Sequence, residues 1–200
     1  KMSSMISPSA NVSSESKIGV GVRVWDYTQI RENSEIGSNT IIGSHVYIDS
    51  NVKIGSNCKI QSKSQLFDSA DIQDGVFIGP GVILTNDRNP RAINENETLK
   101  SALDWKKVGV SVGKGASIGA GSICVAPILI GEWALIGAGS VVTRDVASFA
   151  LVVGNPAKQI GWVGPEGYKL IVVSDGLYEC PKSKAKFKLM NGKLEYLGIE

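Results

Sequence analysis

An aliphatic side chain recurs at every sixth position along much of the chain, and this period constrains the fold more than any other feature of the sequence. The first series has fourteen members: Ile6, Val12, Ile18, Val24, Ile30, Ile36, Ile42, Ile48, Ile54, Ile60, Leu66, Ile72, Ile78 and Leu84. A second series has six: Val112, Ile118, Cys124, Ile130, Ile136 and Val142. A period of six matches neither the α-helical repeat nor the two-residue alternation of a simple strand. Each hexad is therefore predicted to be a structural unit in itself.

The simplest arrangement of such units is a three-sided coil of eighteen residues, in which each hexad supplies one flat side and one corner. The repeating aliphatic residue then points inward, and stacked coils pair as parallel strands about 4.8 Å apart. Twenty hexads predict an all-β fold, a parallel β-helix of about seven coils. The period alone leaves the hand of the coil open.

The two aliphatic series are out of phase, because 112 minus 84 is 28, which is not a multiple of six. Residues 85–111 are therefore predicted to form one long inserted loop, and a long loop leaving a regular scaffold favours a functional role. Beyond the repeat, "SDG" and "NG" turn signals separate short β-rich runs and predict a β-hairpin or meander over residues 163–200. The expected organisation is a β-helix domain over 1–162 with this small extension.

Charge and cysteine content exclude several classes of protein. The 21 Lys and Arg residues nearly balance the 19 Asp and Glu residues without a long basic run, which argues against a nucleic-acid or anionic membrane partner. The stretch "KMSSMISPSA" lacks the apolar core of a secretory signal, so a cytoplasmic location is expected. Three widely spaced cysteines argue against disulfides and are expected to be small buried residues. One histidine cannot supply a three-histidine metal site, and no metal is expected.

Several stretches resemble known enzymes. The segments "IGVGVRV", "IGSNTIIGSHVYI" and "IGAGSICVAPILIGEWALIGAGSVVTRDV" resemble the hexapeptide-repeat acyltransferases, whose coil is a left-handed parallel β-helix. The more specific "VFIGPGVILTNDRNPRA" and "VVGNPAKQIGW" are similar to bacterial enzymes of the UDP-2-acetamido-3-amino-2,3-dideoxyglucuronate N-acetyltransferase type. The resemblance covers nearly the whole chain. It implies acetyl-CoA as cosubstrate, a nucleotide-linked amino sugar as acceptor in surface-polysaccharide synthesis, and a homotrimer in which each insertion reaches toward a neighbour.

The expected chemistry is direct attack of a sugar amine on the acetyl-CoA thioester. A neutral amine is already nucleophilic, so the protein must mainly align it and stabilise the tetrahedral oxyanion. The alternative is an O-acetyltransferase of a sugar or small alcohol, in which His45 takes the hydroxyl proton. The resembling enzymes carry Gln-Asn where this chain has Ser44 and His45, which leaves the identity of the sugar open. A solenoid without enzymatic activity is a third possibility.

The resemblance also implies roles for individual residues. Asn86 matches the asparagine beside the reacting centre, although it could instead begin an Asx turn. Arg91 could bind a carboxylate or phosphate of the acceptor, or could pin the loop to the coil. Asp68 is a second candidate ligand of the acceptor. Whether the nucleotide is UDP or dTDP remains open.

Coenzyme A is expected beside the later coils. Gly119, Ala120, Gly137 and Ala138 have little or no side chain, so the pantetheine arm could reach their backbone amides, although glycine there is also a requirement of the repeat. Arg144 and Lys158 could neutralise the nucleotide phosphates, and Arg144 could equally be an exposed corner charge.

Overall fold

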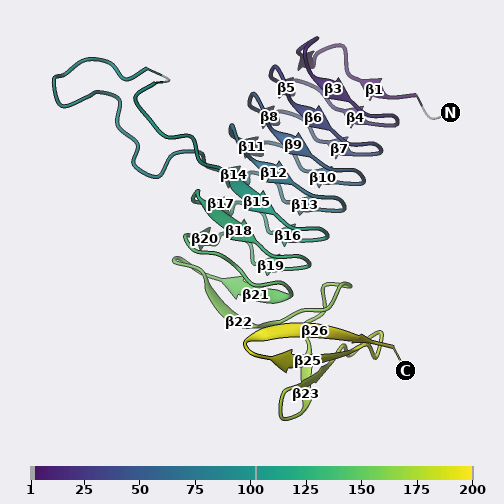
Figure 1. Ribbon diagram of the computed structural model, residues 1–200. Helices are drawn as coiled ribbons and strands as arrows, with labels where there is room; N and C mark the ends of the chain where they lie inside the picture. Colours follow the sequence, from purple (N-terminus) through teal and green to yellow (C-terminus); the bar gives the residue numbers. More distant parts are fainter. Residues whose placement is uncertain (1–2, 102, 200) are drawn as a thin grey trace.

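A computed structural model describes residues 3–101 and 103–199 of the chain. These residues form a three-sided parallel β-helix followed by a small antiparallel sheet, and they contain no helix (Figure 1). We name the three sides of the column faces A, B and C, and the corners between them after the two faces that they join.

Each face is one sheet whose neighbouring strands come from successive coils. Face A contains, in order, β1 (Met5–Ile6), β4 (Arg23–Val24), β7 (Ile41–Ile42), β10 (Lys59–Ile60), β13 (Phe77–Ile78), β16 (Ser117–Ile118), β19 (Leu135–Ile136), β21 (Ala150–Val153) and the antiparallel β22 (Lys158–Trp162). Face B contains β2 (Asn11–Val12), β5 (Gln29–Ile30), β8 (Tyr47–Ile48), β11 (Gln65–Leu66), β14 (Ile83–Leu84), β17 (Ile123–Cys124) and β20 (Val141–Val142). Face C contains β3 (Lys17–Ile18), β6 (Glu35–Ile36), β9 (Lys53–Ile54), β12 (Asp71–Ile72), β15 (Val110–Val112) and β18 (Ile128–Ile130).

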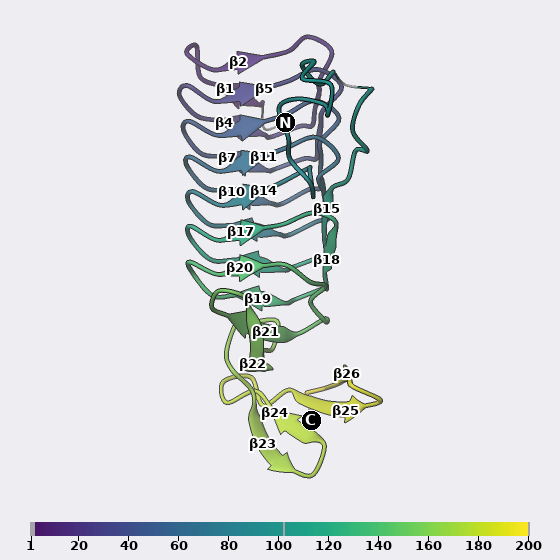
Figure 2. The ribbon, with the colours of Figure 1, turned by 90° about the vertical axis from the view of Figure 1, so that its left-hand side faces the viewer.

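The predicted β-helix is confirmed, and its aliphatic residues stack in columns inside it. Ile42, Ile60 and Ile78 are paired in register on face A and are fully buried. Coil one begins with β1, coil two with β4, and each later coil with the next strand of face A (Figure 2). Seven coils are complete and β21 begins an eighth. The sequence gives no sign of this strand, because Val152 follows Val142 by ten residues instead of a multiple of six.

Glycine after the aliphatic residue is required by close packing between coils. A Cβ atom on Gly37 would lie 2.4 Å from the carbonyl carbon of Gly55. Positive φ occurs two residues later, as at Asn39 (φ 60°) and His45 (φ 57°). The corner therefore uses glycine for space and a separate position for its left-handed turn.

The insertion leaves the column at the B–C corner of coil five, between β14 and β15. It projects away from the column (Figure 1) and runs toward the N-terminal coils (Figure 2). The strands that follow the insertion return to the register of the coils before it: Val112 pairs with Ile72, and Cys124 pairs with Leu84. The coil thus accommodates the long loop without changing its core.

The C-terminal extension is an antiparallel sheet with a core of its own. Its strands, in order, are β23 (Ile171–Ser174), β24 (Leu177–Glu179), β25 (Lys186–Met190) and β26 (Lys193–Gly198). Phe187 is fully buried at its centre, and Phe149 of the last coil packs edge-on against it with 5.6 Å between ring centroids.

The three cysteines are buried, as predicted, and all three are free thiols. In the part of the chain that the structure describes, no helix is long and apolar enough to cross a membrane.

Candidate active site

The residues predicted to bind coenzyme A form a strip of small side chains along the A–B corner of coils six and seven. A Cβ atom on Gly119 would lie 2.5 Å from the nitrogen of Ala138, so packing between coils already explains the glycine. Ala120 and Ala138 are exposed, and their N–H groups donate no hydrogen bond to another described residue. The strip therefore offers free backbone donors on a surface that a slender chain can approach.

The two predicted phosphate-binding residues lie on opposite sides of face B. Lys158, at the start of β22, pairs with Val153 next to the A–B corner. Arg144 lies beyond β20 at the B–C corner and is exposed. Within one chain, the structure brings Lys158 but not Arg144 to the end of the small-residue strip.

The surfaces that flank this strip carry few charges. Outward-facing side chains of the later coils include Phe77, Leu135 and Leu151 on face A and Ile83, Ile123 and Val141 on face B. In coils five and six the corresponding positions of face C are Ser111 and Leu129, and in the earlier coils they are Lys17, Glu35, Lys53 and Asp71. The later coils therefore carry few charges on any face, and faces A and B, which border the strip, are the sides suited to contact with a ligand or another chain there.

Asn86 and Arg91 lie in the insertion, away from the small-residue strip. Asn86 is half-buried and forms no hydrogen bond with any residue of 3–101 or 103–199. Arg91 is exposed, and its Nη1 donates to the carbonyl oxygen of Pro90 at 2.9 Å. Because this bond is local, Arg91 does not pin the loop to the coil.

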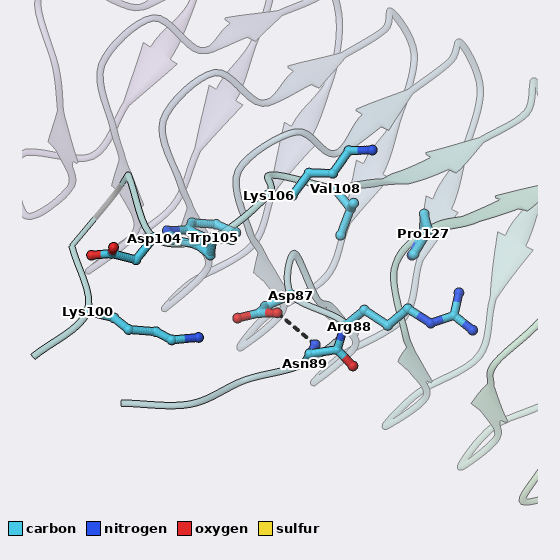
Figure 3. Close-up of a pocket in the computed structure, with 9 residues that line it drawn as sticks. All are labelled: Asp87, Arg88, Asn89, Lys100, Asp104, Trp105, Lys106, Val108 and Pro127. Atoms are coloured by element: carbon cyan, nitrogen blue, oxygen red, sulfur yellow. Dashed lines mark hydrogen bonds between the residues drawn. The ribbon is translucent and has the colours of Figure 1, made fainter. Parts of the chain in front are cut away.

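The two limbs of the insertion enclose a pair of adjoining cavities of about 320 and 410 Å³. Asp87, Lys100 and Trp105 line both of them. Figure 3 shows the first cavity. The first cavity is also lined by Arg88, Asn89, Asp104, Lys106, Val108 and Pro127, and the second by Arg91, Ala92, Leu99 and Ser101. The insertion is therefore a folded, polar structure with an indole ring at its centre.

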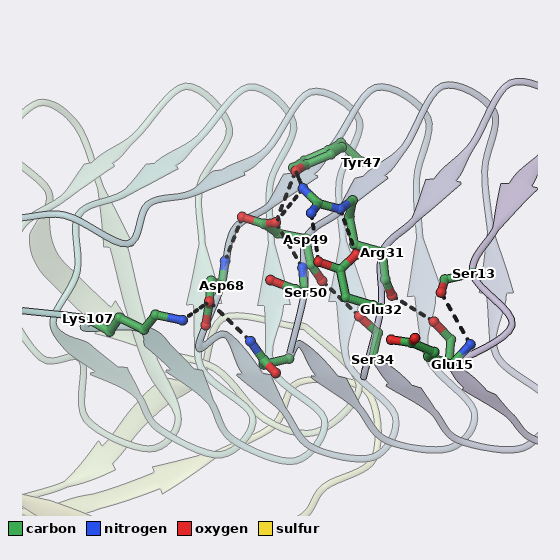
Figure 4. A network of polar contacts seen from close by, with 12 residues as sticks. Ser13, Glu15, Arg31, Glu32, Ser34, Tyr47, Asp49, Ser50, Asp68 and Lys107 are labelled. Carbon is green, nitrogen blue, oxygen red and sulfur yellow. Dashed lines mark hydrogen bonds and ion pairs between the residues drawn. The ribbon is translucent and has the colours of Figure 1, made fainter. Parts of the chain in front are cut away.

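Asp68 lies at the B–C corner of coil four with 6% of its surface exposed. Its Oδ2 accepts hydrogen bonds from Lys107 Nζ at 2.7 Å and from Asn51 Nδ2 at 3.2 Å (Figure 4). Its Oδ1 accepts one from Ser69 Oγ at 2.8 Å. The Asp68–Lys107 ion pair fastens the returning limb of the insertion to the coil, and we call it the latch.

The latch is stable over a wide pH range. Burial raises the pKa of Asp68, but the hydrogen bonds from Lys107, Ser69 and Asn51 outweigh burial and hold this pKa below its ordinary 3.8. The hydrogen bond to Asp68 raises the pKa of Lys107 above 10.5. A lowered acid pKa gives stability that is lost as pH falls through the folded value, and a raised lysine pKa gives stability that is lost as pH rises through it. The latch should therefore hold between pH 4 and 10.

The polar network continues from Asp68 toward the N-terminal coils (Figure 4). Asp49 Oδ2 accepts the backbone N–H of Asp68 at 3.3 Å, and its Oδ1 accepts the Tyr47 hydroxyl at 3.0 Å. Arg31 Nη1 lies 3.6 Å from the same Oδ1, and its Nη2 donates to Glu32 at 2.7 Å. The site at which the insertion is anchored is thus braced over three coils.

Lys107→Ala should loosen the insertion. The substitution removes a charge-assisted hydrogen bond from a nearly buried carboxylate, so local opening should become more frequent. We expect chymotrypsin, which can cut after the exposed Leu99 and Leu103, to cleave the variant faster by on the order of tenfold. Lys106→Ala is the matched control, because Lys106 makes no ion pair with a described residue. Equal cleavage of the two variants would show that the latch does not restrain the loop.

His45 lies at the A–B corner of coil three, three coils from the small-residue strip. It is exposed, and its ring centroid lies 5.1 Å from that of Tyr27. Neither Asn86 nor Asp68 shares its corner. Among the described residues, no group of three or more His, Cys, Asp or Glu side chains could hold a metal ion.

The sequence predictions missed the latch. The eighteen-residue coil length could have placed Asp49 beside Asp68, since they lie one coil and one residue apart at the same corner. The contact of Lys107 with Asp68 could not be predicted in this way. Lys107 lies in the insertion, which does not follow the six-residue period, so its position relative to the coils cannot be counted from the sequence.

Two family models match the chain. The first, described as bacterial transferase hexapeptide (six repeats), matches residues 15–50 and 33–68. The second, described as hexapeptide repeat of succinyl-transferase, matches residues 109–144. These matches show hexapeptide repeats in the β-helix on both sides of the insertion.

Relatives with assigned activities match parts of the chain. The dTDP-3-amino-3,6-dideoxy-alpha-D-galactopyranose 3-N-acetyltransferase of Aneurinibacillus thermoaerophilus is 42% identical over 89 residues, which are 44% of this chain and 45% of that enzyme. The chloramphenicol acetyltransferase of Klebsiella aerogenes is 43% identical over 34% of this chain and 33% of its own length. The chain thus spans less than half the length of these relatives.

Solved structures share the fold. AntD, an N-acyltransferase from Bacillus cereus solved in complex with dTDP and coenzyme A, is 22% identical with a TM-score of 0.50, and the match covers 82% of this chain and 83% of AntD. This likeness shows the β-helix architecture.

Proposed function

We propose that the chain is an acetyl-CoA-dependent N-acetyltransferase that acylates the amino group of a nucleotide-linked amino sugar, of the UDP- or dTDP-3-amino class. The observation that carries the proposal is its 42% identity, over 44% of the chain, to an enzyme that acetylates the 3-amino group of a dTDP-linked sugar. We place the product in bacterial surface-polysaccharide synthesis, the role that the sequence resemblance implies. Acetyl-CoA and nucleotide sugars are cytoplasmic metabolites, so we place the reaction in the cytoplasm.

In the proposed reaction, the neutral sugar amine attacks the thioester carbonyl carbon. A carbon–nitrogen bond forms, the carbon–sulfur bond breaks, coenzyme A leaves as the thiol, and the amine proton is lost. The half-buried Asn86 side chain has no hydrogen-bond partner among the described residues, so its amide oxygen is free to accept from the amine and hold it in line. Desolvation and alignment then provide most of the acceleration.

The donor is proposed to lie along the A–B corner. The free N–H groups of Ala120 and Ala138 would meet the amide oxygens of pantetheine, with Gly119 and Gly137 keeping the approach open. Lys158 would bind a phosphate at the end of the strip. Arg144, across face B, would reach the donor of a neighbouring chain.

Acceptor binding is proposed to depend on the insertion. Among the residues that the structure describes, Arg91 donates only to the carbonyl oxygen of Pro90, so most of its guanidinium is available for a carboxylate or phosphate. Asp68 is a weaker candidate ligand, because the latch and two further hydrogen bonds already occupy its carboxylate. We propose that Asp68 serves the acceptor indirectly, by positioning the insertion.

A homotrimer would complete this site. In one chain, Asn86 lies at the B–C corner while the donor strip lies at the A–B corner, and face B separates them. Packing of faces A and B of the later coils, which carry few charges, against a second copy would bring an insertion from one chain to the strip of the next. Sedimentation equilibrium should give three times the monomer mass.

His45→Ala should leave acetyl transfer nearly unchanged. His45 packs on Tyr27 in coil three, far along the corner from the donor strip, and an amine needs no strong base. We expect kcat within about threefold of the native value. A loss of about 100-fold or more, the size expected for removal of a general base, would instead favour an O-acetyltransferase.

The proposal is tested by coenzyme A release from acetyl-CoA with a panel of UDP- and dTDP-linked amino sugars and the corresponding hydroxyl sugars. Turnover is expected with at least one amino sugar and with none of its hydroxyl counterparts. Release with hydroxyl sugars alone, or with none of the panel, would overturn the proposal.

A further inference from the structure

A separate cavity of about 340 Å³ lies on the column itself, at the A–B corner of coils two to four. Its lining residues are Trp25, Asp26, Ile41, Gly43, Ser44, Gln61 and Ser62. None of these residues has a part in the acetyl transfer proposed above. The proposed reacting centre therefore gives this cavity no function.

Its walls are suited to a flat ring. The Trp25 side chain is 44% exposed at the corner, although large apolar residues of the repeat mostly face inward. A Cβ atom on Gly43 would lie 2.6 Å from the nitrogen of Ser62, so this position must be glycine. No side chain therefore projects into the cavity from Gly43. Ile41 adds a second apolar contact. An exposed indole above a low, partly apolar wall offers a stacking surface.

The polar groups of the cavity are suited to the edge of a heterocycle. The Gln61 side-chain amide forms no hydrogen bond with any described residue, so both its oxygen and its NH₂ are available. Asp26 is held by hydrogen bonds from Ser7 and Ser9, which lower its pKa and keep it an ionised acceptor. An amide that can both donate and accept matches the alternating groups of a pyrimidine ring.

Unpaired positive charge lies beside the cavity. Arg23 and Lys59 are the outward neighbours of Ile41 on face A, one on each side in register. Both are exposed, and neither forms an ion pair with a residue in the described part of the chain. Two free cations next to an aromatic surface suit a base with attached phosphates.

We infer that this cavity binds the pyrimidine base of the acceptor nucleotide, with Trp25 as the stacking surface, Gln61 reading the base edge, and Arg23 and Lys59 binding the diphosphate. The inference rests on the proposed function, because it takes the acceptor to be a nucleotide. Coenzyme A also carries a base, but its proposed strip lies in coils six and seven. The Trp25 cavity therefore belongs to the acceptor.

Calorimetric titration of the full chain with UDP, dTDP and coenzyme A tests this inference without acetyl transfer. Trp25→Leu keeps apolar bulk but removes the ring, and it should weaken UDP or dTDP binding by about 5- to 150-fold, the range associated with base stacking. Trp25→Phe should restore most of the affinity. Gln61→Leu should weaken the same ligand by about tenfold. Coenzyme A binding should be unchanged in all three.

Tyr168→Leu is the control, since Tyr168 is similarly exposed, at 45%, but lies beyond the β-helix. Native-like affinity of Trp25→Leu for both pyrimidine nucleotides, with the native circular dichroism spectrum, would overturn the subsite. So would failure of the native chain to bind either nucleotide, or weakening of coenzyme A alone. Pyrimidine binding through Trp25 without turnover on any amino sugar would instead count against the proposed reaction.

Discussion

Ile60→Asp should lower the free energy of unfolding by at least about 4 kcal/mol, because a carboxylate would replace an aliphatic side chain in a closed apolar column. Ile60 is fully buried and is paired in register with Ile42 and Ile78. Both register partners are aliphatic, so neither can compensate the charge. The introduced acid would have a raised pKa, so its cost should be smallest below about pH 4 and should grow as pH rises toward that raised pKa.

Two control variants make this experiment specific to the column. Lys59 is the preceding residue of β10 and is exposed, so Lys59→Asp should change stability by no more than about 0.5 kcal/mol. Ile60→Val should cost about 0.5–1.5 kcal/mol. Urea unfolding followed by circular dichroism measures all three variants. Similar stabilities for the two aspartate variants would contradict a buried column.

Asn86→Ala should reduce kcat for amine acetylation by about 10²- to 10³-fold, a loss comparable to that of one preorganised hydrogen-bonding group at a reacting centre. KM should change much less, since the proposed contact is to the reacting amine and not to the nucleotide. Initial-rate kinetics with acetyl-CoA and the preferred amino sugar provides both constants.

Asn94→Ala is the matched control for this prediction. Asn94 lies in the same insertion, where its side chain donates to Thr98 within a local turn at 3.3 Å. Its removal should leave kcat within about threefold. If the two variants lose activity equally, Asn86 acts through the conformation of the loop and the proposed alignment of the amine is wrong.

The regular part of the fold was predictable because one rule governs every coil. The side chains of Ile42, Ile60 and Ile78 face the same interior, and a branched aliphatic residue at each position satisfies both the strand and the core. The start of the insertion was equally visible as a break in phase. The eighth coil was not, because β21 enters the stack after a shortened coil.

The candidate site was less predictable, because its parts come from different corners. The small size of Gly119 and Ala138 is visible in the sequence, but only coordinates show that the Gly119 N–H donates to the carbonyl oxygen of Ile136 while the Ala138 N–H has no partner among the described residues. The position of Arg144 across face B depends on which corner each hexad occupies. The link between Asp68 and Lys107 spans 39 positions and an insertion with no period, so only coordinates reveal it.

The most direct test of the account is the chemical structure of the product. The full chain would be incubated with acetyl-CoA and a dTDP- or UDP-linked 3-amino sugar, and the product analysed by two-dimensional NMR. The account predicts a new acetamido group whose amide proton couples to the proton on C3 of the sugar, with an equal amount of free coenzyme A. An acetyl ester on a sugar hydroxyl, with the amine unchanged, would contradict it.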